Sequence, residues 1–141
     1  INYFMIKHNI LFSGDTLFSI GCGRMFEGNP EVFWNSLSKL KQLPEDTKVY
    51  CGHEYTESNL AFALAVEPNN LNTLKAIKQV KEDRSKNKPS LPSLIDTEFK
   101  INPFMRCREI SVIEAAENYS KRKLHSTAEV LGEIRNWKDN F

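Results

Sequence analysis

The amino-acid sequence contains no apolar run of the roughly 18 residues that a membrane-spanning helix requires. It also has no excess of charge of one sign, because 19 basic and 18 acidic side chains give a formal net charge of +1. Bulk electrostatic attraction therefore gives no argument for binding to nucleic acid or to a membrane, and we expect neither as a partner. Hydrophobic residues make up 40% and charged residues 26% of the chain, proportions that predict a soluble, globular fold.

Cysteine is scarce, and its three copies are neither even in number nor paired in spacing. Cys22, Cys51 and Cys107 therefore predict no disulfide framework and favour a reducing compartment, the cytoplasm first and the mitochondrion as the alternative. We expect Cys22 and Cys51 to be buried small residues. A thiolate zinc site made by these two cysteines with His53 is disfavoured, because their spacing matches no zinc finger.

The sequence has neither an initial methionine nor the features of a signal peptide, and it opens in the middle of a strand-like pattern. We therefore expect sequence to be missing upstream of Ile1. Two apolar runs, 3–6 and 10–12, enclose the polar residues 7–9, which predicts a β-hairpin. Residues 29–31 supply a capping asparagine, a first-turn proline and a first-turn acid, and so they predict the start of a helix.

The pattern changes near residue 58, where we expect strands to stop after a last one at 48–51. Residues 88–103 contain three prolines and predict an extended loop. Further helices are expected at 60–66, at 71–80, and after Ser-x-x-Glu capping boxes at 111–114 and 126–129. We therefore divide the chain into a strand–helix–strand part, 1–58, and a helical part, 59–141.

Asp15 and His53 are the first candidates for chemistry, because each lies immediately beyond the end of a predicted strand. Carboxylate oxygen and imidazole nitrogen are common ligands of zinc and iron, so the two side chains could share a metal ion. The residues alone leave a second interpretation open, in which Asp15 is a turn residue and His53 a hydrogen-bonded loop residue. A zinc ion usually has about four ligands, and these two side chains supply only two.

Four segments carry a resemblance to a known family. They are 14–18 (Gly-Asp-Thr-Leu-Phe), 21–24 (Gly-Cys-Gly-Arg), 26–28 (Phe-Glu-Gly) and 49–56 (Val-Tyr-Cys-Gly-His-Glu-Tyr-Thr), and the likeness continues through 102–106 to Arg135, Lys138 and Phe141. They closely resemble glyoxalase II, the hydroxyacylglutathione hydrolases of the metallo-β-lactamase superfamily. The resemblance implies an α/β (α+β) architecture, in which 1–58 is the C-terminal half of an αββα sandwich and 59–141 is the family's helical glutathione-binding domain.

The family's N-terminal half, with its His-x-His-x-Asp-His metal motif, has no counterpart in this sequence. Histidine occurs only at positions 8, 53 and 125. His53 matches a ligand position of the family, whereas His8 and His125 match none and are expected to be exposed. We therefore expect the chain to be the C-terminal half of such an enzyme, with an incomplete metal site.

The resemblance implies a specific reaction. The family hydrolyses the thioester of S-(2-hydroxyacyl)glutathione, such as S-D-lactoylglutathione, to glutathione and a 2-hydroxy acid (D-lactate), which detoxifies methylglyoxal. A hydroxide bridging two metals attacks the carbonyl. An aspartate placed like Asp15 bridges the metals and a histidine placed like His53 completes the second site. We expect zinc, with iron or manganese as alternatives.

The resemblance also implies the residues that bind the glutathione part of the substrate. They are Arg24, Phe26, Tyr55, Arg135 and Lys138. Phe26 stands where the family often has tyrosine, so the hydrogen bond of that hydroxyl is lost. Arg135 and Lys138 lie three residues apart on one face of the last predicted helix, which suits gripping a carboxylate. Without the resemblance, the same pair would be interpreted as a solvated charged face.

Two other functions stay open beside the hydrolase. One is a non-catalytic module that binds glutathione or a partner. The other is an iron-dependent persulfide dioxygenase of the same superfamily, against which the helical C-terminal part with Arg135 and Lys138 argues. The lysine-rich stretch 75–88 is interrupted by acids and predicts a solvated helix face. We expect a monomer whose only partner is the small acyl-glutathione substrate.

Overall fold

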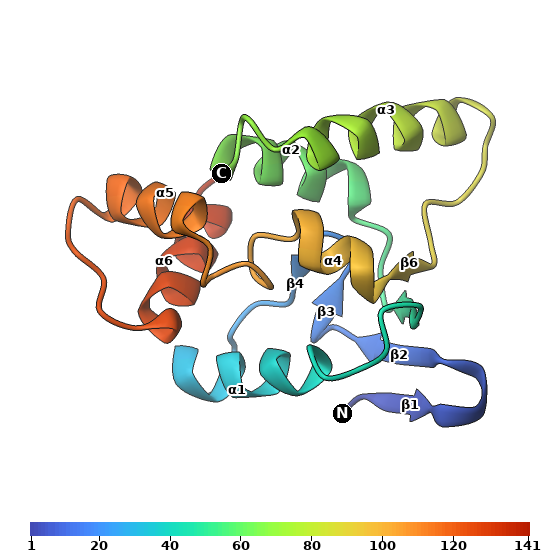
Figure 1. Cartoon of the computed structure of the whole chain (residues 1–141), viewed down its shortest axis with the longest axis horizontal. Helices are drawn as coiled ribbons and strands as arrows, with labels where there is room; N and C mark the ends of the chain where they lie inside the picture. The colour runs from blue at the N-terminus through green and yellow to red at the C-terminus, as the bar shows by residue number, and fades with distance from the viewer.

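The computed structural model describes all residues, 1–141, as a mixed α/β fold with six α-helices and two small sheets. The strands are β1 (Tyr3–Met5), β2 (Ile10–Gly14), β3 (Leu17–Phe18), β4 (Gly21–Cys22), β5 (Lys48–Cys51) and β6 (Ser93–Leu94). The helices are α1 (Pro30–Leu40), α2 (Thr56–Val66), α3 (Leu71–Ser85), α4 (Ile95–Ile101), α5 (Ile110–Ser120) and α6 (Thr127–Asp139). Figure 1 shows the β1–β2 hairpin at one end of the molecule and α5 with α6 at the other. None of the helices combines the length and the apolar character that crossing a membrane requires.

The main sheet has the strand order β1-β2-β5-β6. The predicted hairpin is confirmed, since β1 and β2 pair antiparallel and the chain turns between them through one turn of 3-10 helix, Ile6–His8. β2 then pairs parallel with β5, and α1 lies between them in the sequence. The helix begins as predicted, because the Asn29 side chain accepts a hydrogen bond from the Val32 backbone N–H and Pro30 occupies the first turn.

The two faces of this sheet differ in burial. Leu11 of β2 and Val49 of β5 point into the core, while Phe12 and Tyr50 lie exposed on the opposite face with their ring centroids 5.7 Å apart. This alternation is what a strand with a period of two residues requires when one face is covered.

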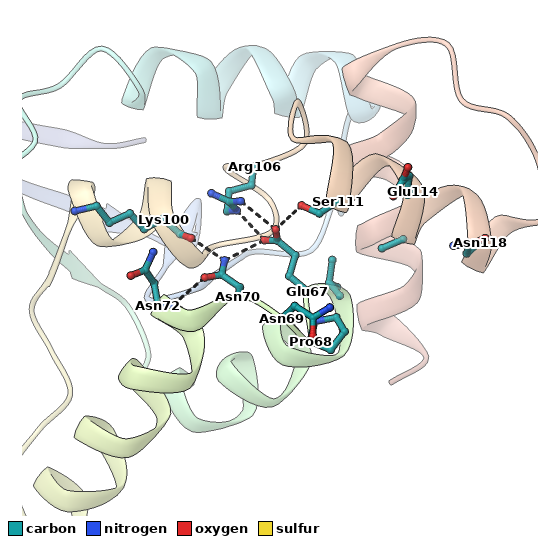
Figure 2. Close-up of a pocket in the computed structure, with 12 residues that line it drawn as sticks. Glu67, Pro68, Asn69, Asn70, Asn72, Lys100, Arg106, Ser111, Glu114 and Asn118 are labelled. Carbon is teal, nitrogen blue, oxygen red and sulfur yellow. Dashed lines mark hydrogen bonds and ion pairs between the residues drawn. The ribbon is translucent and has the colours of Figure 1, made fainter.

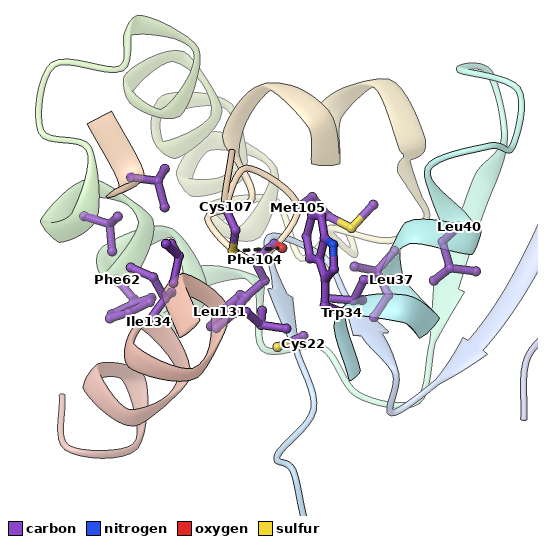
Figure 3. Packing of buried hydrophobic residues seen from close by; sticks show 14 of the residues in the cluster. Cys22, Trp34, Leu37, Leu40, Phe62, Phe104, Met105, Cys107, Leu131 and Ile134 are labelled. Carbon is purple, nitrogen blue, oxygen red and sulfur yellow. Dashed lines mark hydrogen bonds between the residues drawn. The ribbon is translucent and has the colours of Figure 1, made fainter. Parts of the chain in front are cut away.

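The larger of two hydrophobic clusters contains 18 buried residues and joins the sheet to the helices. Figure 3 labels Trp34, Leu37 and Leu40 of α1 as members of this cluster, together with Met105, Leu131 and Cys22. The cluster therefore draws residues from both sides of residue 58. The division of the chain at that point stays a prediction.

Two expectations for the helical part are wrong. Residues 88–103 are not one extended loop, because they contain β6 and α4. β6 pairs antiparallel with β5, so strands do not stop at residue 51. The prolines misled the interpretation, since they flank the regular elements at 89, 92 and 103 without interrupting them. The burial of Ile95 and Ile101 then stabilises the short helix between them.

The two predicted capping boxes have different outcomes. The Ser126 side chain does cap α6, accepting from the Glu129 N–H at 3.2 Å, while the Glu129 carboxylate accepts from the His125 N–H. Ser111 caps nothing, because α5 begins one residue earlier, at Ile110. Its hydroxyl instead donates to the buried carboxylate of Glu67 at 2.6 Å. A tertiary hydrogen bond has therefore replaced the local one.

Glu67 is the centre of the polar cluster drawn in Figure 2. Its carboxylate accepts two hydrogen bonds from the Arg106 guanidinium, at 2.7 and 3.0 Å, besides the bonds from Ser111 and Asn70. Burial by itself raises the pKa of Glu67, but the hydrogen bonds from Arg106 and Ser111 outweigh it and the pKa is lowered. The cluster ties the end of α2 to the start of α5.

Glu98 of α4 is fully buried and holds the β3–β4 turn. Its carboxylate accepts from the Ile20 backbone N–H at 2.8 Å and from the Asn102 amide at 2.7 Å. The same amide also donates to the Gly21 carbonyl at 3.0 Å. Burial raises the pKa of Glu98 to about 7, and the hydrogen bonds offset only part of this effect.

The raised pKa predicts a specific pH dependence of stability. Between an ordinary pKa of 4.5 and the folded value of about 7, the folded chain binds the Glu98 proton more tightly than the unfolded chain. Stability is therefore lost as the pH rises through this window. We expect the free energy of unfolding, measured in urea from pH 5 to pH 8, to fall by up to about 3 kcal/mol more in the parent than in Glu98→Gln. Parallel curves for the two proteins would contradict this role.

Candidate functional site

A cavity of about 560 Å³ opens where β2 and β5 end. The seven residues that the sequence singled out all line it: Asp15, Arg24, Phe26, His53, Tyr55, Arg135 and Lys138. They come from the β2–β3 turn, the segment after β4, the segment after β5, and α6. The structure thus brings together residues up to 123 positions apart in the sequence.

Asp15 and His53 meet because their strands run parallel. The register sets Gly14 opposite Cys51, and the Gly52 N–H donates to the Gly14 carbonyl at 2.9 Å. Both side chains therefore leave the sheet at the same edge, where parallel strands present functional groups. Asp15 Oδ1 lies 3.8 Å from His53 Nε2, and both side chains are more than half exposed, at 66% and 54%.

Glycine lets the backbone come close to Asp15 from two sides. A Cβ on Gly52 would lie 2.6 Å from Asp15 Oδ1, and a Cβ on Gly23 would overlap the Asp15 carbonyl oxygen. Any side chain at either position would therefore displace the aspartate.

No third histidine, cysteine, aspartate or glutamate joins Asp15 and His53 in a cluster that could hold a metal ion. Of the other histidines, His8 and His125 are exposed, as expected. The three cysteines are free thiols, as expected, but Cys51 is only half-buried. Burial raises the pKa of Cys22 to about 12, so this thiol stays protonated at the floor of the cavity.

Arg135 is buried, with 6% of the residue exposed, and its charge is already paired. Its guanidinium donates to the Cys22 carbonyl and to the Asp139 carboxylate, both at 3.0 Å, and packs over the Phe104 ring at 5.1 Å. The sequence treated Arg135 and Lys138 as an equivalent pair. The structure distinguishes them, because Arg135 fastens α6 to β4.

Lys138 keeps its ammonium at the cavity wall. The Nζ atom donates to the Ser58 carbonyl at 3.2 Å and lies over the rings of Phe62 and Phe141. Burial lowers the pKa of Lys138, the nearby charge of Arg135 lowers it further, and Asp139 opposes both. No carboxylate pairs with this ammonium at ion-pair distance, so it has donors left for an anionic ligand.

Arg24 and Phe26 form the outer rim of the cavity. The Arg24 side chain is 68% exposed, and its Nε lies 3.4 Å from the Asp139 carboxylate. Phe26 is 86% exposed. Asp139 therefore sits between two guanidiniums, those of Arg24 and Arg135. Sequence reasoning assigned it no role, although its spacing of four residues from Arg135 on a helix was a usable signal.

Besides Cys22 and Gly23, three more residues of the lining were missed. From the sequence, no catalytic, metal-binding or substrate-binding role was predicted for Phe18, Ser58 or Asn59, which all line the cavity. Asn59 donates from its side chain to the Ser19 carbonyl at 3.0 Å, and Ser58 supplies the carbonyl that Lys138 contacts. Ser58 and Asn59 shape the wall from α2 and Phe18 shapes it from β3, which only the tertiary structure reveals.

A second cavity, of about 490 Å³, lies beside Glu67 and is the one drawn in Figure 2. Its walls are mainly amides and charged groups, but the buried carboxylate and the Arg106 guanidinium satisfy each other. It contains no acid–imidazole pair. The cavity at the ends of β2 and β5 is therefore the candidate functional site.

Comparison with known proteins identifies the relatives of this chain. A family model described as hydroxyacylglutathione hydrolase C-terminus matches residues 54–141. Proteins named hydroxyacylglutathione hydrolase from Nitrosomonas europaea and Pseudomonas savastanoi are 47% and 50% identical over 94% of this chain, which covers 51% of each. One from Pseudoalteromonas translucida is 49% identical over 96% of the chain, which covers 54% of it.

The chain thus spans about half the length of the curated relatives that it matches. The resemblance noted in the sequence is confirmed over the helical part by the family model and over nearly the whole chain by the relatives. The chain belongs to the hydroxyacylglutathione hydrolase C-terminus family.

Proposed function

We propose that the chain forms the glutathione-binding half of a hydrolase that cleaves S-(2-hydroxyacyl)glutathione to glutathione and a 2-hydroxy acid. One observation carries this proposal: a single cavity holds an acid–imidazole pair at the strand ends and an unpaired ammonium on α6. The relatives' shared name supplies the substrate class. The substrate has a thioester carbonyl, which would react beside the acid–imidazole pair, and glutathione carboxylates at a distance from it, which the ammonium would bind.

Asp15 and His53 are the residues that would hold metal. Their donor atoms lie 3.8 Å apart and are exposed to the cavity, and the glycine at position 52 leaves the aspartate free of a neighbouring side chain. Divalent metal, zinc in the first place, would supply water activation and stabilise a developing oxyanion. The pair gives two donors where about four are needed, so we assign the remaining ligands to the half of the enzyme outside this chain.

Lys138 is the residue that we assign to a glutathione carboxylate, because its ammonium reaches the cavity and has no carboxylate partner. Tyr55, Arg24 and Phe26 extend the contact surface along the wall and rim. Arg135 adds positive potential from below while it fixes the position of α6. Together these residues bind and orient the thioester.

The setting of this function is also a proposal. Three free thiols suit a reducing compartment, for which we take the cytoplasm. We further propose that the protein acts as a monomer on a small molecule.

Metal content tests the first assignment. Since two of about four ligands are present, we expect less than one zinc per chain after dialysis, measured by elemental analysis. Asp15→Ala and His53→Ala should remove what remains, whereas His8→Ala, at an exposed position, should not. Two tightly bound zinc ions per chain would contradict the assignment.

Ligand binding tests the second assignment. We expect Lys138→Ala to weaken binding of an unreactive S-alkylglutathione by about 1–3 kcal/mol in calorimetry, because a charge-assisted hydrogen bond is lost. Lys75→Ala removes an exposed lysine of α3 and should leave affinity unchanged.

Arg135→Ala completes this comparison. Its paired, buried guanidinium predicts a loss of about 2–4 kcal/mol in the free energy of unfolding, while Lys138→Ala loses under about 1 kcal/mol. Equal affinity of Lys138→Ala and the parent for the S-alkylglutathione would refute the assignment of Lys138.

A further inference from the structure

The His53 imidazole is held by aromatic rings and not by a hydrogen bond. Its polar contact within the chain is the one with Asp15, and no carbonyl or carboxylate accepts from its other ring nitrogen. Histidines that bind metal are usually oriented by such an acceptor. Here the imidazole stacks on the Tyr55 ring instead, with centroids 5.1 Å apart and planes inclined by 18°.

Phe18 closes this arrangement from below. The residue is 7% exposed, and its ring meets the Tyr55 ring edge-on with centroids 5.2 Å apart, while its centroid lies 6.1 Å from that of His53. Each pair falls in the range in which rings attract one another. Phe18 thus packs against both His53, a candidate metal ligand, and Tyr55, a candidate substrate-binding residue, although its own side chain is apolar.

The position of Phe18 is in turn fixed by a strained turn. Ile20, two residues further on, has φ of +60°, a conformation that costs a β-branched residue free energy. The turn persists because Glu98 accepts from the Ile20 N–H and Asn59 donates to the Ser19 carbonyl. Backbone strain of this kind tends to be retained where a side chain must be aimed.

We propose that Phe18 is a positioning residue that holds the His53 imidazole and the Tyr55 ring in the orientation needed to bind metal and glutathione. This inference rests on the proposed function for the roles of His53 and Tyr55, but the ring geometry on which it depends is independent of that function.

The test is NMR of the imidazole protons in the whole chain, with and without zinc. His8 and His125 are exposed and serve as internal references. In the parent, ring currents from Tyr55 should shift the His53 carbon-bound protons upfield of both references. Phe18→Leu should move them towards the references and weaken zinc binding at His53 by about tenfold. Phe18→Tyr, which keeps the ring, should behave as the parent.

The matched control is Phe12→Leu. Phe12 also stacks on a tyrosine, Tyr50, but on the exposed face of the sheet, so its loss should change neither readout. The indole signals of Trp34 and Trp137 report folding, and Phe18→Met, which keeps more buried volume, takes the place of Phe18→Leu if the latter unfolds.

Unchanged His53 shifts in Phe18→Leu would overturn the proposal, and so would shifted signals with unchanged zinc affinity. A different result would refute the metal role of His53 instead. In that case the parent binds no zinc, but its His53 signals lie upfield and still move in Phe18→Leu. The two failures are therefore distinguishable.

Discussion

The parallel pairing of β2 with β5 is the constraint on which the candidate site depends. Its register brings the two strands to an end at the same edge, and the bond from the Gly52 N–H to the Gly14 carbonyl closes the ladder there. Asp15 and His53 follow that bond directly, so their proximity is a property of the backbone before it is one of their side chains. Close approach of this kind requires positions without a Cβ, which explains glycine at 52 and at 23. Backbone hydrogen bonds, which take no part in any reaction, therefore fix the positions of Asp15 and His53 at this edge.

The helical part brings the positive charges of Arg135 and Lys138 to this edge. Burial of the Arg135 charge costs free energy, which nearby hydrogen bonds offset. A guanidinium as buried as that of Arg135 destabilises a protein unless it is paired and hydrogen-bonded. The Cys22 carbonyl and the Asp139 carboxylate satisfy two of its nitrogens, and Cys22 itself lines the cavity. The same contacts fix the rotation of α6, so that Lys138, one turn along, presents its ammonium to the open space. One helix face thus carries the paired guanidinium of Arg135 and, one turn later, the ammonium of Lys138 that we propose as the partner of a substrate carboxylate.

The sequence predicted the elements with strong local signals. The hairpin, the capped start of α1, the strand β5 and the Ser126 cap were all found because side chain and backbone interact within a few residues. The prediction failed where a distant partner decides: Ser111 bonds to Glu67, and β6 forms only because β5 offers an edge. The candidate site residues were proposed from motifs of a family, and the structure brings them together in the lining of one cavity, while their roles stay a prediction. The difference between Arg135 and Lys138 could not be predicted, since burial depends on how α6 docks.

Chemical-shift mapping of the backbone amides tests the central claim most directly, namely that the cavity at the ends of β2 and β5 binds the glutathione part of the substrate. With an unreactive S-alkylglutathione added to the whole chain, the account predicts the largest changes at Gly23, Tyr55 and Ser58, which line this cavity. Changes concentrated at Asn70 and Asn72, beside Glu67, would place the ligand in the other cavity. Either that pattern or an unperturbed spectrum at saturating ligand would contradict the account.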